Sequence, residues 1–128
     1  ELNARPSRLG FGCMRFPTTP EGKIDEPLAV SMLDAAYRAG VNYFDTAYIY
    51  PGSEVALGEI FEKNQIREQA YIATKLPHYL IKKYEDLDKL FGEELKRLRT
   101  DYVDCYLMHM LTDTDTWNRL KSLGIEDI

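Results

Sequence analysis

Four short apolar runs alternate along this chain with helix-like segments, and this alternation constrains the fold more than any other feature of the sequence. The runs cover residues 9–14, 41–44, 70–74 and 102–108. Between them, apolar residues recur at the three- and four-residue spacing of an amphipathic helix. Alternating strands and helices predict a parallel sheet with right-handed helical crossovers. We therefore expect an α/β fold.

The expected helices carry their own start and stop signals. The first follows Asp25 as a candidate N-cap, has Pro27 in its first turn and closes at Gly40. The second is expected to use Ser53 as its N-cap, and the short fourth is expected to end at Gly124. The apolar faces of the four helices comprise Ala29, Met32, Leu33 and Ala36; Leu57, Ile60 and Phe61; Leu87, Leu90, Phe91, Leu95 and Leu98; and Trp117, Leu120 and Leu123.

Length, charge and cysteine content exclude several classes of protein. A chain of 128 residues, 45% of them hydrophobic, can support a single core. Its net charge of -5 offers no electrostatic footprint for nucleic acid or anionic lipid. The sequence has neither a run of about 18 apolar residues nor a signal-peptide pattern, so we expect no membrane partner and a cytoplasmic location. The two cysteines, Cys13 and Cys105, are expected to be buried thiols, and they argue against a structural metal in this segment.

Polar side chains follow the later apolar runs at the points where strands are expected to end. Asp45, Lys75 and His109 occupy these points, and Tyr50 lies in the segment directly after Asp45. Their separations are 30 and 34 residues, against roughly 31 per unit in a barrel of eight units and about 250 residues. Each residue alone has an ordinary explanation: a turn cap, a solvated cation, a core histidine. Because parallel strands end at one edge of a sheet, we expect the four side chains to converge there.

Such a set of side chains has a definite chemistry when it is assembled. A carboxylate can hold an ammonium group in place, and an ammonium beside a phenol favours the phenolate, lowering the usual phenol pKa of about 10. The phenol can then act as an acid near neutral pH, while a neutral imidazole orients a carbonyl oxygen. The set can protonate a carbonyl but carries no hydride. A carbonyl reduction would therefore require a nicotinamide cofactor.

The motifs around these residues resemble those of the aldo-keto reductase family. The resemblance extends from about residue 9 to about residue 124. It is carried by Gly40-Val-Asn-Tyr-Phe44, Asp45-Thr-Ala-x-x-Tyr50, Ser53-Glu54, Leu57-Gly58, Thr74-Lys75 and Leu107-Met-His109. The segment from Gly10 to Pro17 also resembles a bacterial branch of the family whose members often carry a ferredoxin-like extension. The resemblance implies a (β/α)8 TIM barrel, of which residues 1–128 would supply the first four βα units as one incomplete domain.

The resemblance also implies a catalytic tetrad. Tyr50 would be the general acid, Lys75 the cation that acidifies it, Asp45 the anchor of Lys75, and His109 the group that orients the substrate carbonyl, so Tyr50 and His109 would contact the substrate. The cofactor would be NADPH or NADH, with the loop Gly12-Cys13-Met14-Arg15 and Asp45 near its nicotinamide end. The phosphate-binding loops of such a barrel follow strands seven and eight. We therefore expect them, and the groups that select the small carbonyl substrate, to lie outside residues 1–128.

Other interpretations stay open from the sequence. A lysine at the end of a barrel strand can also serve as the nucleophile of a Schiff-base aldolase, which would use Lys75. A half-barrel has open sheet edges, so the chain could instead be a non-catalytic module that self-associates or is completed by a second half-barrel. His78 could line a substrate pocket, although a loop histidine is more often solvated. Trp117 could shape the same pocket, but packing of its helix is the stronger interpretation.

Overall fold

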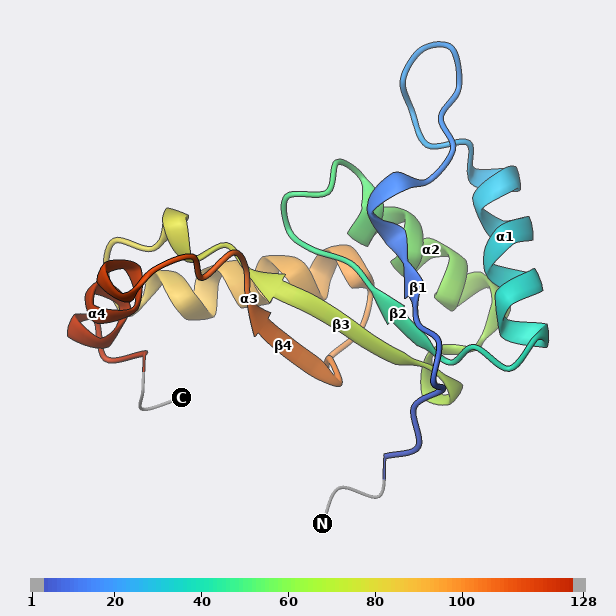
Figure 1. The fold of residues 1–128 in the computed structure, drawn as a ribbon. Helices are drawn as coiled ribbons and strands as arrows, with labels where there is room; N and C mark the ends of the chain where they lie inside the picture. The colour runs from blue at the N-terminus through green and yellow to red at the C-terminus, as the bar shows by residue number, and fades with distance from the viewer. Residues whose placement is uncertain (1–3, 126–128) are drawn as a thin grey trace.

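The computed structural model describes residues 4–125, in which four parallel strands form one sheet (Figure 1). The strands are β1 (Phe11–Gly12), β2 (Tyr43–Asp45), β3 (Tyr71–Leu76) and β4 (Cys105–Met108). They lie in the order β1-β2-β3-β4, and each pairs with the next in parallel. Their carboxyl ends therefore share one edge of the sheet. The expected α/β architecture with a parallel sheet is confirmed.

Helices connect successive strands, as the alternation predicts. They are α1 (Glu26–Arg38), α2 (Ser53–Asn64) and α3 (Asp86–Leu98), and a fourth helix, α4 (Thr114–Ser122), follows β4. Single 3-10 turns occur at Cys13–Arg15 (η1), Arg67–Gln69 (η2) and His78–Leu80 (η3). The sequence also indicates the start of a further element at residues 125–128, of which residues 126–128 lie outside the described residues. Within residues 4–125, no helix is long and apolar enough to cross a membrane.

The signals expected to bound α1 are confirmed. The Asp25 carboxylate accepts a hydrogen bond from the backbone N–H of Leu28 at 3.1 Å, and Pro27 occupies the first turn. Gly40 follows the helix with a φ of +91°, a conformation that strains residues with a side chain. The buried face is narrower than expected, because Met32 is 39% exposed.

The prediction that Ser53 caps α2 is wrong. The N-cap is Gly52, whose φ of +71° favours glycine, and the Ser53 side chain makes no capping hydrogen bond. Ser53 is buried, and its hydroxyl donates to the backbone carbonyl of Cys13 at 2.7 Å. The Thr46 hydroxyl lies 2.8 Å from the Ser53 hydroxyl oxygen and donates to it, because the Ser53 proton is already engaged by Cys13. A buried hydroxyl thus closes the base of the loop between β2 and α2.

Two expected strands are shorter than the apolar runs that predict them. The run at residues 9–14 yields only β1, because the chain turns into η1 at Cys13. The run at residues 102–108 yields β4 only from Cys105, because the Asp104 carboxylate accepts the N–H of Ile72 at 2.9 Å in place of a strand partner. Cys13 is fully buried as expected, whereas Cys105 is only half-buried.

Helices α1, α2 and α3 share one core against one face of the sheet (Figure 1). The strand residues of this core are Phe44 and Ile72, and a smaller second cluster surrounds Leu120 of α4. Because side chains alternate along a strand, residues next to Phe44 and Ile72 in sequence face the other way. Leu107 is 42% exposed on that opposite face. The helical contributions to the main core are Ala29, Leu33, Leu57, Ile60, Phe61 and Leu98.

Candidate active site

Three titratable side chains lie together at the carboxyl edge of the sheet. Asp45 is the last residue of β2, and His109 comes directly after the last residue of β4. Lys75 was expected to follow its strand, but it lies inside β3, which continues to Leu76. The strand registers pair Lys75 with Leu107, so Lys75 and His109 lie near the same end of the sheet. The parallel register therefore produces the convergence that the sequence spacing predicts.

The ammonium group of Lys75 is held on two sides. Its Nζ lies 2.7 Å from Oδ2 of Asp45 and donates a second hydrogen bond of 2.7 Å to the backbone carbonyl of Thr46. The Lys75 side chain is only 14% exposed, and that of Asp45 is 36% exposed. A cation held by a carboxylate and a carbonyl loses most of the freedom of a surface lysine. Lys75 is thus a fixed positive charge facing the loop that follows β2.

Tyr50 lies close to both Lys75 and His109. The Nζ of Lys75 is 5.0 Å from the centroid of the Tyr50 ring. The rings of Tyr50 and His109 meet edge to face, with centroids 5.8 Å apart and planes at 89°. The structure therefore brings together all four side chains that the sequence singles out, although they come from three strands and a loop.

His109 is placed to act as a neutral imidazole. It is 8% exposed, and its backbone N–H donates to the carbonyl of Leu76 at 3.2 Å. Burial, assisted by the positive charge of Lys75, holds the pKa of His109 below its usual range. Its Nδ1 atom is buried and finds no hydrogen-bond partner within residues 4–125. The ring thus keeps one nitrogen that the described protein atoms do not use.

The loop expected to approach a cofactor starts at the same edge. Gly12 pairs with Asp45 in the sheet, and a Cβ at Gly12 would meet no described atom within 4 Å. Met14 and Arg15 are exposed, whereas the Cys13 side chain is fully buried and its carbonyl is occupied by Ser53. Cys13 can therefore face a ligand only through its main chain. The open space at Gly12 fits a ligand bound at this edge.

His78 and Trp117 serve packing in this structure. His78 is buried, with Nδ1 3.5 Å from a guanidinium nitrogen of Arg119 and Nε2 3.4 Å from the carbonyl of Met110. An arginine can only donate and a carbonyl can only accept, so the hydrogen of the His78 ring lies on Nε2. Trp117 packs against the cluster around Leu120, which supports the packing interpretation. His78 is therefore neither solvated nor free to bind a substrate.

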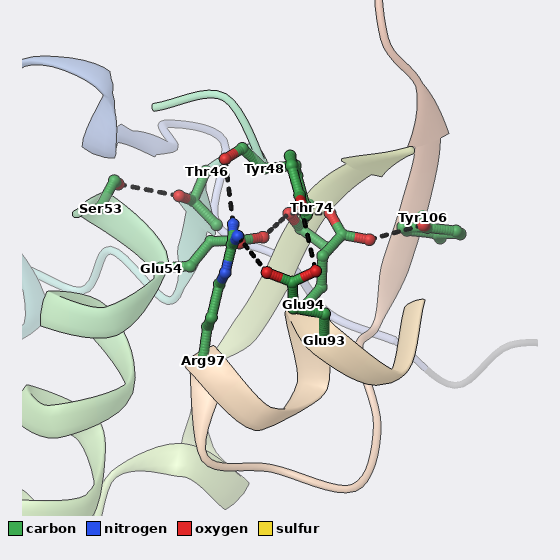
Figure 2. A network of polar contacts seen from close by, with 9 residues as sticks. All are labelled: Thr46, Tyr48, Ser53, Glu54, Thr74, Glu93, Glu94, Arg97 and Tyr106. Carbon is green, nitrogen blue, oxygen red and sulfur yellow. Dashed lines mark hydrogen bonds and ion pairs between the residues drawn. The ribbon is translucent and has the colours of Figure 1, made fainter. Parts of the chain in front are cut away.

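Sequence reasoning missed a buried polar network between the sheet and the helices (Figure 2). The Thr74 hydroxyl donates to Glu54 at 2.6 Å, and Tyr106 donates to Glu94 at 2.5 Å. Burial raises the pKa of Glu94 to about 8, and the charge of Glu54 adds to the shift. One signal was present: the spacing of Leu90, Glu94 and Leu98 on α3 puts this glutamate on the apolar face. The other members shown are Thr46, Tyr48, Ser53, Glu93 and Arg97.

Comparisons with known sequences match this arrangement to one family. The sequence model described as "Aldo/keto reductase family" matches residues 8–126. The chain is 30% identical to "Probable aldo-keto reductase 1" of Glycine max over 131 residues, covering 91% of this chain and 38% of that protein. It is 36% identical to L-galactose dehydrogenase of Arabidopsis thaliana over 109 residues, covering 80% of this chain and 34% of that protein. The chain thus spans little more than a third of the length of these relatives.

Solved structures give the same result for the fold. An aldo-keto reductase from Pseudomonas aeruginosa superposes with a TM-score of 0.74 at 26% identity, over 95% of this chain and 54% of that one. An aldo/keto reductase from Brucella melitensis gives a TM-score of 0.66 at 34% identity, over 91% of this chain and 42% of that one. These proteins are (β/α)8 barrels, and the four parallel strands described above correspond to half of such a barrel. The chain belongs to the aldo/keto reductase family.

Proposed function

We propose that this chain supplies the acid–base groups of an NAD(P)H-dependent reductase that converts aldehydes or ketones to alcohols. The observation that carries the proposal is the Lys75 ammonium, fixed by Asp45 and directed at the ring of Tyr50 beside His109. This arrangement supports a phenol as the proton donor. The substrate is a small carbonyl compound, and the expected compartment is the cytoplasm.

The first step assigned to this site is orientation of the carbonyl. The low pKa of His109 keeps its imidazole neutral at pH 7, so that the ring can donate one hydrogen bond without carrying a charge. A donor directed at the carbonyl oxygen stabilises the negative charge that develops there during reduction. His109 and Tyr50 thus form the substrate-facing pair.

The second step is proton transfer from Tyr50 to the carbonyl oxygen. Loss of that proton leaves a phenolate, which the nearby positive charge of Lys75 stabilises. The Asp45 carboxylate holds Lys75 in place during this step. A general acid placed in this way contributes about 10² to 10⁴ in rate.

A nicotinamide cofactor, NADPH or NADH, would supply the hydride if it were bound at the same edge. In this chain, the residues proposed to hold the nicotinamide end of the cofactor are Gly12, Cys13, Met14, Arg15 and Asp45. Gly12 offers open space beside Asp45, and Arg15 offers an exposed cation. Because the chain spans only part of the length of its relatives, we propose that a second half-barrel completes the cofactor site.

A Schiff-base aldolase is a weaker explanation of the same lysine. The Lys75 Nζ is engaged by a carboxylate and a carbonyl, both of which favour the charged ammonium. A nucleophilic lysine needs the neutral amine. Borohydride trapping of a carbonyl substrate on Lys75 would nevertheless favour the aldolase.

The experiment that tests the reductase combines light scattering during size-exclusion chromatography, NADPH fluorescence titration and an aldehyde reduction assay. Nicotinamide binding followed by aldehyde-dependent NADPH oxidation, in a monomer or a defined assembly, is the expected result. The proposal would be contradicted if the assembled chain binds neither NADPH nor NADH and oxidises neither cofactor in the presence of an aldehyde. That outcome would favour the non-catalytic half-barrel module.

A further inference from the structure

Arg97, close to the end of α3, reaches across to the loop that carries Tyr50 (Figure 2). Its Nη1 donates to the backbone carbonyl of Tyr48 at 3.2 Å, and its guanidinium lies 4.0 Å from the centroid of the Tyr48 ring. The Arg97 side chain therefore contacts both the main chain and the ring of Tyr48. Tyr48 lies two residues before Tyr50.

The guanidinium is itself held by two carboxylates. Nη1 lies 3.3 Å from Glu54, which is 2% exposed in the first turn of α2, and Nη2 lies 2.5 Å from Glu93 on α3. Glu93 also accepts a hydrogen bond of 3.1 Å from the Tyr48 hydroxyl. A planar group with several donors can satisfy these partners and stack on a ring at the same time, which a lysine ammonium cannot do. Arg97 is therefore a rigid link between two helices and the loop.

The rest of the loop is a short, closed turn. The Tyr50 N–H donates to the Ala47 carbonyl at 3.1 Å, and the Ser53 N–H donates to the Tyr50 carbonyl at 3.1 Å. The Thr46 and Ser53 hydroxyls close its base. In such a turn, a movement of Tyr48 is passed on to Tyr50, because few free backbone torsions separate them. A shift of Tyr48 would therefore move Tyr50 relative to Lys75 and His109.

We propose that Arg97 is a positioning residue for Tyr50, and that its contacts with Tyr48 set the distance and angle of the phenol relative to His109. This inference rests on the proposed function for its effect on catalysis, but its geometric part can be measured without turnover. Arg97 acts through Tyr48 and need not touch a substrate.

Replacement of Arg97 by methionine, with Arg99→Met as the matched control, tests the proposal. Arg99 also pairs with two carboxylates, Glu59 and Glu62, but they lie on the exposed side of α2, and within residues 4–125 its side chain forms no hydrogen bond or ion pair with the Tyr50 loop. Both variants lose one charge and two ion pairs. With NADPH and a simple aldehyde, we expect kcat to fall about 10- to 100-fold in Arg97→Met with a smaller change in KM. We expect kcat of Arg99→Met to stay near wild type.

The readout independent of activity is the NMR spectrum of the imidazole protons of His109. The sequence contains only two histidines, so His78→Gln assigns the signals. The edge-to-face Tyr50 ring shifts the His109 protons, and Tyr50→Ala gives their positions without it. In Arg97→Met we expect these signals to move toward those of Tyr50→Ala. Arg97→Lys, which keeps the charge, should move them in the same direction and serves if the methionine variant does not fold.

The outcomes distinguish a failure of the positioning role of Arg97 from a failure of the proposed reductase function. If the His109 signals of folded Arg97→Met or Arg97→Lys coincide with wild type, the positioning role is refuted, whatever the activity. If Arg99→Met moves the signals as far as Arg97→Met does, a general effect of charge explains the result and the proposal is also refuted. If the signals move as expected in a chain without reductase activity, the positioning of Tyr50 stands and the proposed function fails.

Discussion

Helices α2 and α3 touch at Gly58, and replacing this glycine by alanine is the sharpest test of the packing described above. An added Cβ would lie 2.6 Å from the Arg97 carbonyl oxygen and 2.6 Å from the Leu98 carbonyl carbon. Both atoms belong to helix backbone, so neither can turn aside as a flexible side chain would. The two helices would have to move apart at the point where α3 presents Arg97.

The size of the effect follows from two opposing contributions. Alanine in place of a helical glycine gains about 1 kcal/mol of helix propensity. Forcing an extra carbon into a filled contact usually costs about 1–3 kcal/mol, and a clash with rigid backbone on both sides belongs at or above the upper end. We therefore expect Gly58→Ala to lower the free energy of unfolding by about 2 kcal/mol. The same displacement should reach the Tyr50 loop through Arg97.

Gly92→Ala is the matched control. Gly92 lies in α3, is exposed, and an added Cβ would meet no described atom within 4 Å. Only the gain in helix propensity applies there, so we expect the variant to be about 0.5–1 kcal/mol more stable than wild type. Urea unfolding followed by circular dichroism measures both variants. A Gly58→Ala variant as stable as Gly92→Ala would refute the close approach of α2 and α3.

Two further predictions concern charge. Glu94 has a pKa of about 8 in the folded chain, above the usual 4.5, so its contribution to stability is complete below about pH 4.5 and is lost as the pH rises through 8. In urea titrations between pH 5 and 9, Glu94→Gln should flatten this fall in stability. An unchanged slope would contradict the prediction. The charge of Lys75 contributes to the low pKa of His109, so Lys75→Met should raise that pKa in an NMR titration, whereas an unchanged or lower value would refute the placement of the ammonium.

The positions of the candidate site could be predicted from sequence because parallel strands impose them. Asp45, Lys75 and His109 each come from the carboxyl end of a strand, and the register of β2, β3 and β4 brings those ends together whatever the loops do. The position of Tyr50 follows in the same way, because a short turn brings this residue back over the same edge of the sheet. The alternation of strands and helices likewise predicts the parallel sheet with its helical crossovers, whereas the half-barrel comes from the family resemblance.

Other features depend on contacts between residues that are distant in the sequence, so they could not be predicted from the sequence alone. Ser53 has the residue type of a helix cap, but its hydroxyl bonds the Cys13 carbonyl, forty positions away. The burial of Glu94 becomes intelligible only when Thr74 and Tyr106 are seen to supply its partners. The role of Arg97 requires the approach of α3 to the loop after β2. None of these pairings follows from local spacing or residue type.

Tyr50→Phe shows whether Tyr50 gives the proton in a carbonyl reduction, provided that cofactor binding and turnover are measured on the same sample. Tyr84→Phe removes the hydroxyl of an exposed tyrosine outside the site and is the control. We expect Tyr50→Phe to bind NADPH as wild type does but to reduce a simple aldehyde at least about 100-fold more slowly. Reduction by Tyr50→Phe at the wild-type rate would contradict the claim.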